Sequence, residues 1–306
     1  MKVAAIDCGT NSVRLLVAEP ASGGGLVDLD RRLILTRLGQ GVDATGQFHP
    51  DALRRTLDAF AEYAQVIEEF GADRVRLVAT SAARDASNRD EFFAGARSLL
   101  GVDAEIISGD EEAALSFRGA LTALPDVAAP ALVMDIGGGS TELVLGSGGI
   151  TPRIEHGLSL DIGSVRVRER FLAGDPPTGA QIDAASDYID ALLDSSGIPF
   201  ADVATWIGVG GTATSLSAVS QRLPEYDRTR VHGSTLARHD LSALTQQLLG
   251  SSVAQVRELP SMHPKRADVI CAGALIADRV GRRVQVDLTV SESDILDGLA
   301  LGLLEA

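Results

Sequence analysis

Three observations on the sequence predict an α/β protein of about two domains. Short apolar runs alternate along the chain with longer segments whose apolar residues recur at helical spacing, so helices are expected to layer on a sheet. A turn of the form Asp-x-Gly-x-x-Ser follows an apolar run at residues 7–12 and again 128 residues later, at 135–140. The length of 306 residues suits domains of roughly 100–200 residues. Two such turns in two domains suggest loops that face each other across a cleft.

The chain is expected to open with a meander of strands rather than a strand–helix–strand unit. Apolar runs at Val3–Ile6 and Val13–Ala18 flank the polar turn from Asp7 to Ser12. The glycine-rich stretch at residues 22–25 is a second turn signal, and further strand is expected between Leu26 and Leu38.

A long helix is predicted from Pro50, because proline suits the first helical position, to a stop at Gly71. Its apolar residues at a period of 3.6 define the expected buried face: Leu53, Leu57, Phe60, Ala64 and Ile67.

The rest of the chain alternates between the two element types. The expected strands are Val75–Thr80, Ala104–Ile107, Ala131–Met134, Thr141–Leu145, Val203–Val209 and Val284–Val290. The expected helices are Asn88–Leu100 (capped by Asn88), Gly109–Leu124, Ala180–Leu193, Thr212–Ser220, Lys265–Val280 and Asp294–Leu304. Pro125 and Pro130 bracket the expected domain boundary.

Composition and charge exclude several classes of protein. Hydrophobic residues make up 45% and charged residues 23%, which is ordinary for a folded globular chain. The 27 basic residues are outnumbered by 42 acidic residues, for a net charge of −15. An acidic chain argues against nucleic acid and against an anionic membrane as partners. A small polyanionic ligand remains compatible, because backbone amides and a few arginines can create a local positive site.

The cysteine count and the N-terminus indicate a reducing compartment. The two cysteines, Cys8 and Cys271, allow at most one bridge and have no zinc-binding spacing. The apolar run at the N-terminus meets Asp7 too soon for a signal peptide, and no 18-residue apolar window suggests a membrane span. A cytoplasmic protein is therefore expected. The five histidines show no ligand spacing, Cys8 is expected to be a small buried side chain, and Trp206 is expected in the second core.

The two repeated turns suit a phosphate bound through a cation. Glycines at the end of a strand let backbone amides approach an anion closely. A carboxylate in the same turn, Asp7 or Asp135, would repel bare phosphate unless a divalent cation lies between them. Magnesium commonly uses one or two carboxylates together with water and phosphate oxygens. A single copy of such a turn would read as an ordinary β-hairpin, whereas the pair favours phosphate binding.

A second candidate is the segment Ser108-Gly109-Asp110-Glu111-Glu112. Three acids in the first turn of a helix complement its macrodipole, which is one interpretation. The other is that one glutamate acts as a general base for water attacking phosphorus. Position in the fold has to separate the two.

Arg84 and a late glycine loop complete the candidates. Arg84 follows a strand end, where its planar fork could bind phosphate, although a surface ion pair is the plain alternative. The segment 208–213 reads as GxGxxA, but its late position and the lack of a following strand that ends in an acid argue against a dinucleotide site. A third phosphate or nucleotide loop fits better, and the sequence has no P-loop.

Together these motifs resemble the Ppx/GppA phosphatases, which are exopolyphosphatases and guanosine pentaphosphate phosphohydrolases. The resemblance runs through residues 7–12, 108–112, 135–142, 208–212, 265–268 and 294–298. It implies an α/β, actin-like ATPase fold of two ribonuclease H-like domains around a cleft, usually in a homodimer that depends on Mg²⁺, with Mn²⁺ as the alternative ion. The expected domains are residues 1–124, to which the C-terminal helix 293–306 returns, and residues 125–292.

The resemblance also assigns roles to residues. It places the catalytic base on Glu112 and the metal-binding acids on Asp135 and Glu142, and the argument from the hairpins adds Asp7. Arg14 and Arg266 match arginines of members with nucleotide activity. The expected substrate-binding residues are Gly9, Thr10, Asn11, Ser12, Arg14, Arg84, Gly137, Gly138, Gly139, Ser140, Gly210, Gly211 and Arg266.

The predicted function is hydrolysis of the terminal phosphoanhydride of inorganic polyphosphate, with pppGpp as the alternative substrate. An actin-like small-molecule kinase and a nucleotide-dependent filament protein are more remote alternatives. Residues 295–298, Ile-Leu-Asp-Gly, depart from the Leu-Arg-Glu-Gly of the family. Longer members add C-terminal helical domains, so a short binding track is expected here, with kcat/KM levelling off at short chain length.

Overall fold

The computed structural model describes residues 1–22, 24–124, 126–148 and 153–305, and it divides into two units. The first unit comprises residues 1–122 and 294–306, and the second comprises residues 123–293. None of the helices in the described ranges has the length and apolar character that crossing a bilayer demands.

The first unit is built on a five-stranded mixed sheet of order β3-β2-β1-β4-β5. The first three strands form an antiparallel meander, and β4 and β5 continue the sheet parallel to β1. The strands are β1 Val3–Cys8, β2 Val13–Pro20, β3 Leu26–Ile34, β4 Arg74–Ala79 and β5 Ala104–Ile106. The helices are α1 Val42–Thr45, α2 Pro50–Phe70, α3 Ser81–Asp85, α4 Asp90–Leu100, α5 Gly109–Ala123 and α13 Ile295–Glu305.

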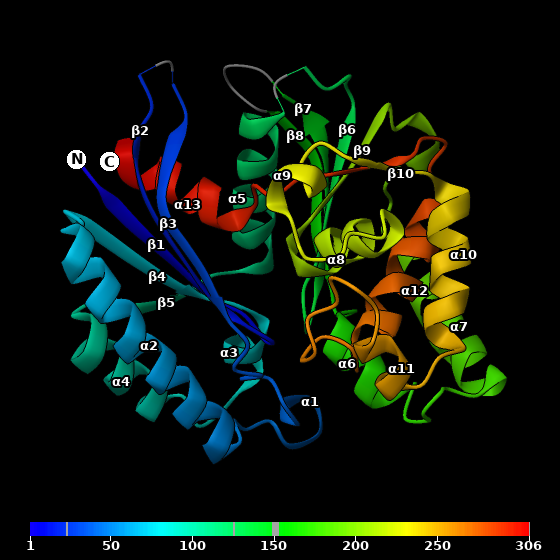
Figure 1. The fold of residues 1–306 in the computed structure, drawn as a ribbon, viewed down its shortest axis with the longest axis horizontal. Coiled ribbons are helices and arrows are strands. Elements are labelled where there is room, and N and C mark those ends of the chain that lie inside the picture. The colour runs from blue at the N-terminus through cyan, green and yellow to red at the C-terminus, as the bar shows by residue number, and fades with distance from the viewer. Residues whose placement is uncertain (23, 125, 149–152, 306) are drawn as a thin grey trace. The chain divides into compact units, whose positions relative to one another are not determined.

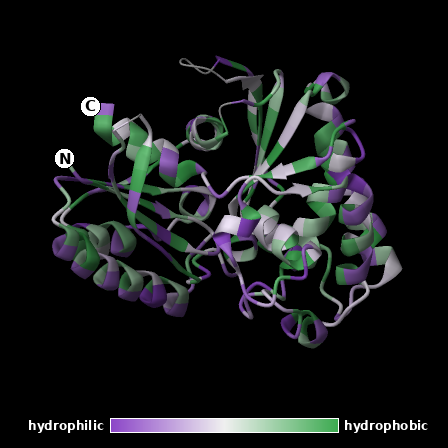
Figure 2. Ribbon diagram, turned by 45° about the horizontal axis from the view of Figure 1, so that its top comes forward, coloured by the Kyte–Doolittle hydropathy of each residue, from purple (hydrophilic) through white to green (hydrophobic). Residues whose placement is uncertain are grey.

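Helices cover both faces of this sheet, which is why β1 is apolar at nearly every position. Ala4 and Ile6 face a core that includes residues of α2 and α4, which lie side by side in Figure 1. Val3 and Ala5 face the opposite way and pack against α13, so the C-terminal helix belongs to the first sheet. Figure 2 shows α2 and α4 with alternating hydrophobic and hydrophilic bands, as helices with one buried side require.

Two local predictions in this unit need correction. The buried stripe of α2 is rotated from the predicted face: Thr56 and Tyr63 are buried, whereas Leu57 is only half-buried. The Tyr63 hydroxyl donates to the Val13 carbonyl oxygen at 2.8 Å, which holds this side of the helix on β2. Asn88 does not cap α4, because its side chain bonds both the N–H and the carbonyl of Phe48, at 2.7 and 3.1 Å.

The second unit has a six-stranded sheet of order β10-β11-β9-β6-β7-β8. Its strands are β6 Ala131–Ile136, β7 Thr141–Ser147, β8 Arg153–Leu160, β9 Thr205–Val209, β10 Thr235–Leu236 and β11 Leu288–Val290. Its helices are α6 Ser164–Arg170, α7 Gly179–Ser195, α8 Gly210–Ser220, α9 Arg228–Val231, α10 Arg238–Leu249, α11 Val253–Arg257 and α12 Ile270–Gly281, with a 3₁₀ turn η1 at Phe200–Asp202.

The two sheets share one topology. In each, a three-strand antiparallel meander is extended from its first strand by two parallel strands: β4 and β5 beside β1, and β9 and β11 beside β6. This is the ribonuclease H-like arrangement. The predicted fold class, α/β and actin-like with two ribonuclease H-like domains, is confirmed.

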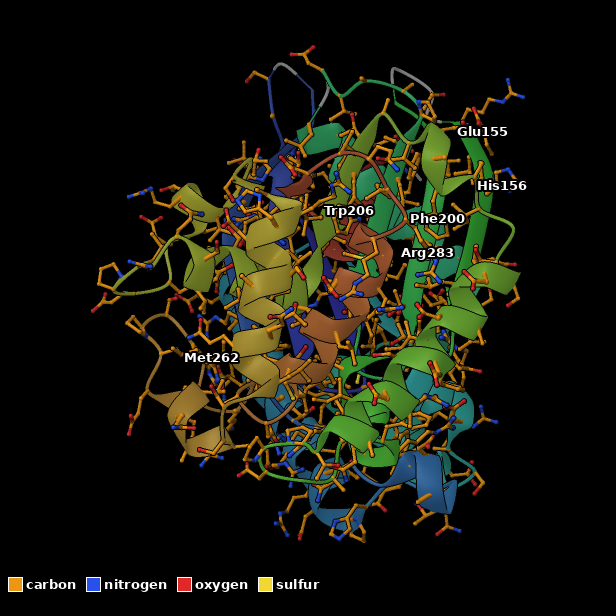
Figure 3. All side chains as sticks on the ribbon, turned by 90° about the vertical axis from the view of Figure 1, so that its right-hand side faces the viewer. Glu155, His156, Phe200, Trp206, Met262 and Arg283 are labelled. Carbon is orange, nitrogen blue, oxygen red and sulfur yellow. The ribbon has the colours of Figure 1, made fainter. Side chains whose placement is uncertain are left out.

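The core of the second unit contains Trp206 at full burial, as predicted, and Figure 3 shows this side chain within the unit. The helix predicted from Lys265 begins only at Ile270, because a turn comes first in which Lys265 N–H donates to His263 Nδ1. The strand predicted from Val284 is shorter and begins at Leu288.

Helices α5 and α13 cross at glycines, and this crossing gives a stability prediction. A Cβ on Gly119 would overlap the carbonyl oxygen of Asp294, and a Cβ on Gly298 would overlap that of Leu115. Backbone cannot move aside as a flexible side chain can, so Gly119→Ala is expected to lower the free energy of unfolding by about 1–3 kcal/mol. Gly179→Ala is the matched control, because a Cβ there meets nothing within 4 Å. Thermal unfolding should show a lower Tm for the first variant only; equal Tm values would contradict the close crossing.

Candidate active site

The two repeated turns form the same closed hairpin in the two units. In the first, the Gly9 N–H donates to the Ser12 carbonyl oxygen at 2.9 Å; in the second, Gly137 N–H donates to that of Ser140 at 3.0 Å. The flanking strands pair in the same register, which sets Asp7 opposite Arg14 and Asp135 opposite Glu142. The sequence repeat is therefore a structural repeat down to its hydrogen bonds.

The second hairpin turn is held from one side by helix α6. The carbonyls of Gly137 and Gly138 accept from the backbone N–H groups of residues 164–166, and the Gly139 carbonyl accepts from Arg166 Nε at 2.8 Å. Gly163 lies so close to Gly138 that a Cβ would overlap its carbonyl. Within the described ranges, no backbone carbonyl bonds the N–H groups of residues 138–140. The carbonyl groups of the turn are thus hydrogen-bonded within the protein, and its backbone N–H groups can bind an anion.

The first hairpin turn is supported in a similar way by the segment that follows β3. The Thr10 carbonyl accepts from Gly39 N–H at 2.8 Å, and the Asn11 carbonyl accepts from Arg37 N–H at 3.0 Å. The Thr10 hydroxyl also hydrogen-bonds the Ser81 hydroxyl at 2.8 Å, which links the turn to the start of α3.

The aspartates of the two hairpins face cross-strand residues of opposite charge: Asp7 faces an arginine and Asp135 a glutamate. Asp7 Oδ2 accepts from Arg14 Nε at 3.0 Å and Nη2 at 2.7 Å, and Arg14 Nη1 is also paired with Asp294. Burial raises the pKa of Asp7, with the Arg14 charge opposing that shift. Burial likewise raises the pKa of the Cys8 thiol, a buried side chain as predicted, which disfavours its reactive thiolate form. Asp7 is thus matched by a guanidinium in this structure, and the metal role that the hairpin argument gives it stays a prediction.

Asp135 and Glu142 do fit a divalent cation. They stand directly opposite each other on paired strands, on the face turned away from Met134, and are only 8% and 1% exposed. Carboxylate oxygens set side by side in this way are ligands of the kind that Mg²⁺ takes in proteins. Ser159 on β8 donates to Glu142 Oε1 at 2.7 Å and orients that carboxylate. No cluster of three or more metal-binding side chains occurs in the described part of the chain, and Mg²⁺ needs only one or two carboxylates.

The start of helix α5 separates the two neighbouring glutamates. Ser108 caps the helix: its hydroxyl accepts from Glu111 N–H at 3.1 Å and its carbonyl from Glu112 N–H at 3.0 Å. The Glu111 side chain is 45% exposed and pairs with Arg76 at 2.9 Å. The Glu112 side chain is 12% exposed, and its Oε2 accepts from Arg84 Nη1 at 2.9 Å. Of the two acids, Glu112 is thus the one joined to a predicted substrate-binding arginine.

Arg84 is positioned by a helix that the sequence pattern does not reveal. Helix α3 spans only Ser81–Asp85, too short for any apolar period to appear. From its last turn Arg84 Nη1 also donates to the Ile107 carbonyl oxygen at 3.0 Å. This contact anchors the guanidinium beside the strand end from which α5 begins.

The third glycine loop, residues 208–213, packs against the second hairpin. Gly210 has φ +73°, and a Cβ there would lie 2.5 Å from Asp135 Oδ1, so only glycine suits this position. The Thr212 hydroxyl donates to the Ile136 carbonyl oxygen at 3.1 Å. Arg266, from the turn before α12, contacts the same loop: its Nη1 donates to the Gly211 carbonyl and, at 3.1 Å, to the Ser215 hydroxyl.

Comparison with known proteins identifies the family of this chain. Residues 16–304 match the model of the Ppx/GppA phosphatase family. The chain belongs to this family. It is 46% identical over 317 residues to Exopolyphosphatase 2 of Mycobacterium tuberculosis, a match that covers 99% of this chain and 98% of that protein. A hydrolase of phosphoanhydride bonds is thereby identified.

Solved structures agree with this family. A crystal structure described as an exopolyphosphatase-like protein has a TM-score of 0.94 at 41% identity and covers 100% of this chain and 99% of its own. The structure of the Aquifex aeolicus Ppx/GppA family member has a TM-score of 0.84 at 30% identity, covering 100% and 98%. The resemblance seen in the sequence is therefore confirmed.

Within each unit, the Ppx/GppA site residues fall into compact groups. In the first unit Glu112 meets Arg84, and Asp7 meets Arg14; in the second, the hairpin 135–142 meets Gly210. Sequence reasoning missed two partners, Ser159 and Asp294. The first lies on β8, a strand we did not predict, and the second gives no local signal that it reaches β2, because 280 residues separate it from Arg14.

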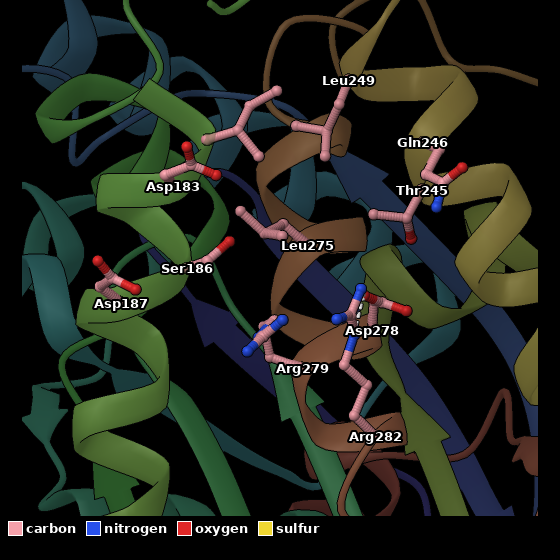
Figure 4. A pocket seen from close by; sticks show the side chains of 11 residues that line it. Asp183, Ser186, Asp187, Thr245, Gln246, Leu249, Leu275, Asp278, Arg279 and Arg282 are labelled. Atoms are coloured by element: carbon pink, nitrogen blue, oxygen red, sulfur yellow. Dashed lines mark hydrogen bonds and ion pairs between the residues drawn. The ribbon is translucent and has the colours of Figure 1, made fainter. Parts of the chain in front are cut away.

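A separate pocket of about 520 Å³ lies among α7, α10 and α12 of the second unit and contains none of the predicted site residues. Figure 4 shows Asp278 beside Arg282, with which it forms an ion pair, and Arg279, which is paired with Asp190. Its arginines are thus engaged by neighbouring acids rather than directed to a ligand.

Proposed function

We propose that this Ppx/GppA protein is an exopolyphosphatase that releases the terminal phosphate of inorganic polyphosphate with Glu112 as general base. The observation that carries the proposal is its 46% identity to Exopolyphosphatase 2 over almost the full length of both chains. The chemistry of the described residues supports it.

Glu112 suits the role of general base. It is buried, lies at the start of α5, and has its Oε2 oriented by Arg84. In the proposed step a water oxygen bonds to the terminal phosphorus and its proton passes to the Glu112 carboxylate. The bond between that phosphorus and the bridging oxygen breaks, which yields orthophosphate and a polyphosphate shorter by one unit. Arg84 carries a positive charge that can stabilise the phosphoryl oxygens while it holds the base.

The glycine turns supply the anion binding. The amides of residues 138–140 have no backbone acceptor in the described chain, and the turn is braced by α6, so they are positioned for phosphate oxygens before the substrate arrives. Asp135 and Glu142 are the residues that would hold Mg²⁺, or Mn²⁺ in its place. When bound, such an ion neutralises charge on the phosphate oxygens.

The proposal is tested by measuring phosphate release from polyphosphates of several lengths and from pppGpp under the same conditions. We expect kcat/KM to be higher for polyphosphate. A higher kcat/KM for pppGpp would replace the proposal with a guanosine pentaphosphate phosphohydrolase. Transfer of the phosphoryl group to an added alcohol in place of water would indicate a kinase instead.

Arg266 gives a sharper comparison between the two substrates. Its guanidinium lies against the third glycine loop, where Nη1 donates to the Gly211 carbonyl. Arg266→Ala is therefore expected to raise KM for pppGpp more than KM for short polyphosphate. The neighbouring Lys265→Ala serves as the control for loss of one positive charge. An equal rise for both substrates would assign Arg266 to general phosphate binding.

A further inference from the structure

The glycine turn of the second hairpin contains three consecutive peptide units whose carbonyl groups are all held by the start of α6. The carbonyl oxygens of Gly137 and Gly138 accept from the backbone N–H groups of residues 164–166 at 2.9–3.1 Å. The carbonyl oxygen of Gly139 accepts instead from a side chain, Arg166 Nε, at 2.8 Å. All three carbonyl groups therefore point toward the same short segment of the chain.

These carbonyl groups determine where the N–H groups of the turn point. In a trans peptide the C=O and the N–H of one unit point in opposite directions, and the carbonyl of each residue shares its unit with the N–H of the next. The carbonyls of residues 137–139 thus orient the N–H groups of residues 138–140 away from α6. Within the described ranges no backbone carbonyl accepts from these N–H groups. Consecutive N–H groups on one side of a turn form a concave site for an anion.

The unit between Gly139 and Ser140 differs from the other two because a side chain holds it. Glycine adopts both signs of φ at little cost, so a peptide unit that follows glycine can rotate as a whole. Such a rotation would present a carbonyl oxygen, rather than an N–H, to an anion. Arg166 opposes it with a charged donor, and its side chain is buried, which makes the hydrogen bond stronger than one between neutral groups.

The first hairpin holds the equivalent carbonyl by other means. Asn11 lies 128 residues before Gly139, and its carbonyl oxygen accepts from the Arg37 N–H at 3.0 Å. Arg37 has φ +55°, in the left-handed region that is unfavourable for a residue with a Cβ atom. The same carbonyl is thus held in both hairpins, by a backbone N–H in the first and by a side chain in the second.

We propose that Arg166 is a positioning residue of the active site: its hydrogen bond to the Gly139 carbonyl directs the Ser140 N–H toward a phosphate oxygen of the substrate. The inference rests on the proposed function, which supplies the phosphate. Without the guanidinium the unit between Gly139 and Ser140 can rotate, and two of the three N–H groups remain in place. The expected loss is therefore in phosphate binding and turnover.

The test follows the backbone ¹⁵N–¹H signals of Gly138, Gly139 and Ser140 while orthophosphate is added to the whole chain with Mg²⁺. All three signals should shift in wild type. In Arg166→Met the Ser140 signal should no longer shift, whereas the two glycine signals should, because backbone donors still hold their units. A Ser140 signal that shifts as in wild type would overturn the inference.

The same spectra separate this inference from the proposed function. Shifts in wild type without hydrolysis of polyphosphate would contradict the proposed hydrolysis and leave the inference standing. Absence of any shift in wild type would overturn the inference together with the phosphate binding assigned to this turn.

Steady-state hydrolysis gives a second readout. Arg166→Met is expected to lower kcat/KM for polyphosphate by at least ~10-fold, since the loss of one oriented N–H donor is costly in an active site. Arg166→Lys keeps the charge and one donor and should recover part of this loss, and Arg257→Met, which removes an exposed arginine of α11, should match wild type. If Arg166→Met does not fold, Arg166→Lys takes its place: a reduced Ser140 shift supports the inference, and a wild-type shift and rate overturn it.

Discussion

Glu112→Gln is expected to lower kcat for polyphosphate hydrolysis by at least ~10²-fold, the usual size of a general-base contribution. The substitution keeps the shape of the side chain and removes the oxygen that accepts the proton. KM should change little, because the base acts in the transition state rather than in substrate binding. Steady-state phosphate release, measured on folded protein of unchanged Tm, checks both values.

Glu111→Gln is the matched control, since it is the same substitution one residue earlier. Successive helix residues point about 100° apart, so the two side chains leave α5 in different directions. Glu111 pairs with Arg76 at the surface, and its loss is expected to leave kcat nearly unchanged. If Glu111→Gln abolishes turnover and Glu112→Gln does not, the base is the other glutamate. If both remain active, neither acid activates the water.

Removal of divalent cations is expected to abolish phosphate release, and added Mg²⁺ should restore it. The physical reason is the pair Asp135–Glu142, two buried carboxylates on one face of a hairpin that is also expected to bind a polyanion. A cation bound there would offset the repulsion between these carboxylates and the negatively charged substrate. The measurement is the rate in EDTA, before and after excess Mg²⁺ or Mn²⁺.

The control for this prediction compares acids in the two hairpins. Asp135→Asn should need far more Mg²⁺ for half-maximal rate than wild type does, whereas Asp7→Asn should need a similar concentration, because Asp7 is matched by Arg14. Full activity in EDTA would remove the cation from the mechanism. A higher Mg²⁺ requirement in Asp7→Asn alone would move the cation to the first hairpin.

Local chemistry was enough for the sequence by itself to determine the α/β class, the repeated hairpin and the burial of Trp206. These features depend on residues that are close together in the sequence. They are the periods of strands and helices, the glycines at strand ends and the acids at a helix start. The repeat of the Asp-x-Gly-x-x-Ser turn after 128 residues predicted two similar hairpins. In the structure each is closed by an equivalent backbone hydrogen bond, Gly9 to Ser12 and Gly137 to Ser140. Together these motifs also identified the family.

Only the tertiary structure decided which acids can do which chemistry. The sequence pattern does not distinguish Glu111 from Glu112. Packing leaves the Glu111 side chain at the surface and brings the Glu112 side chain to Arg84. Asp7 and Asp135 are equivalent in their turns, yet the return of the C-terminal segment brings Asp294 to Arg14 beside Asp7. Burial makes an unpaired charge costly, so the partners that long-range folding brings near an acid determine whether it can bind a cation.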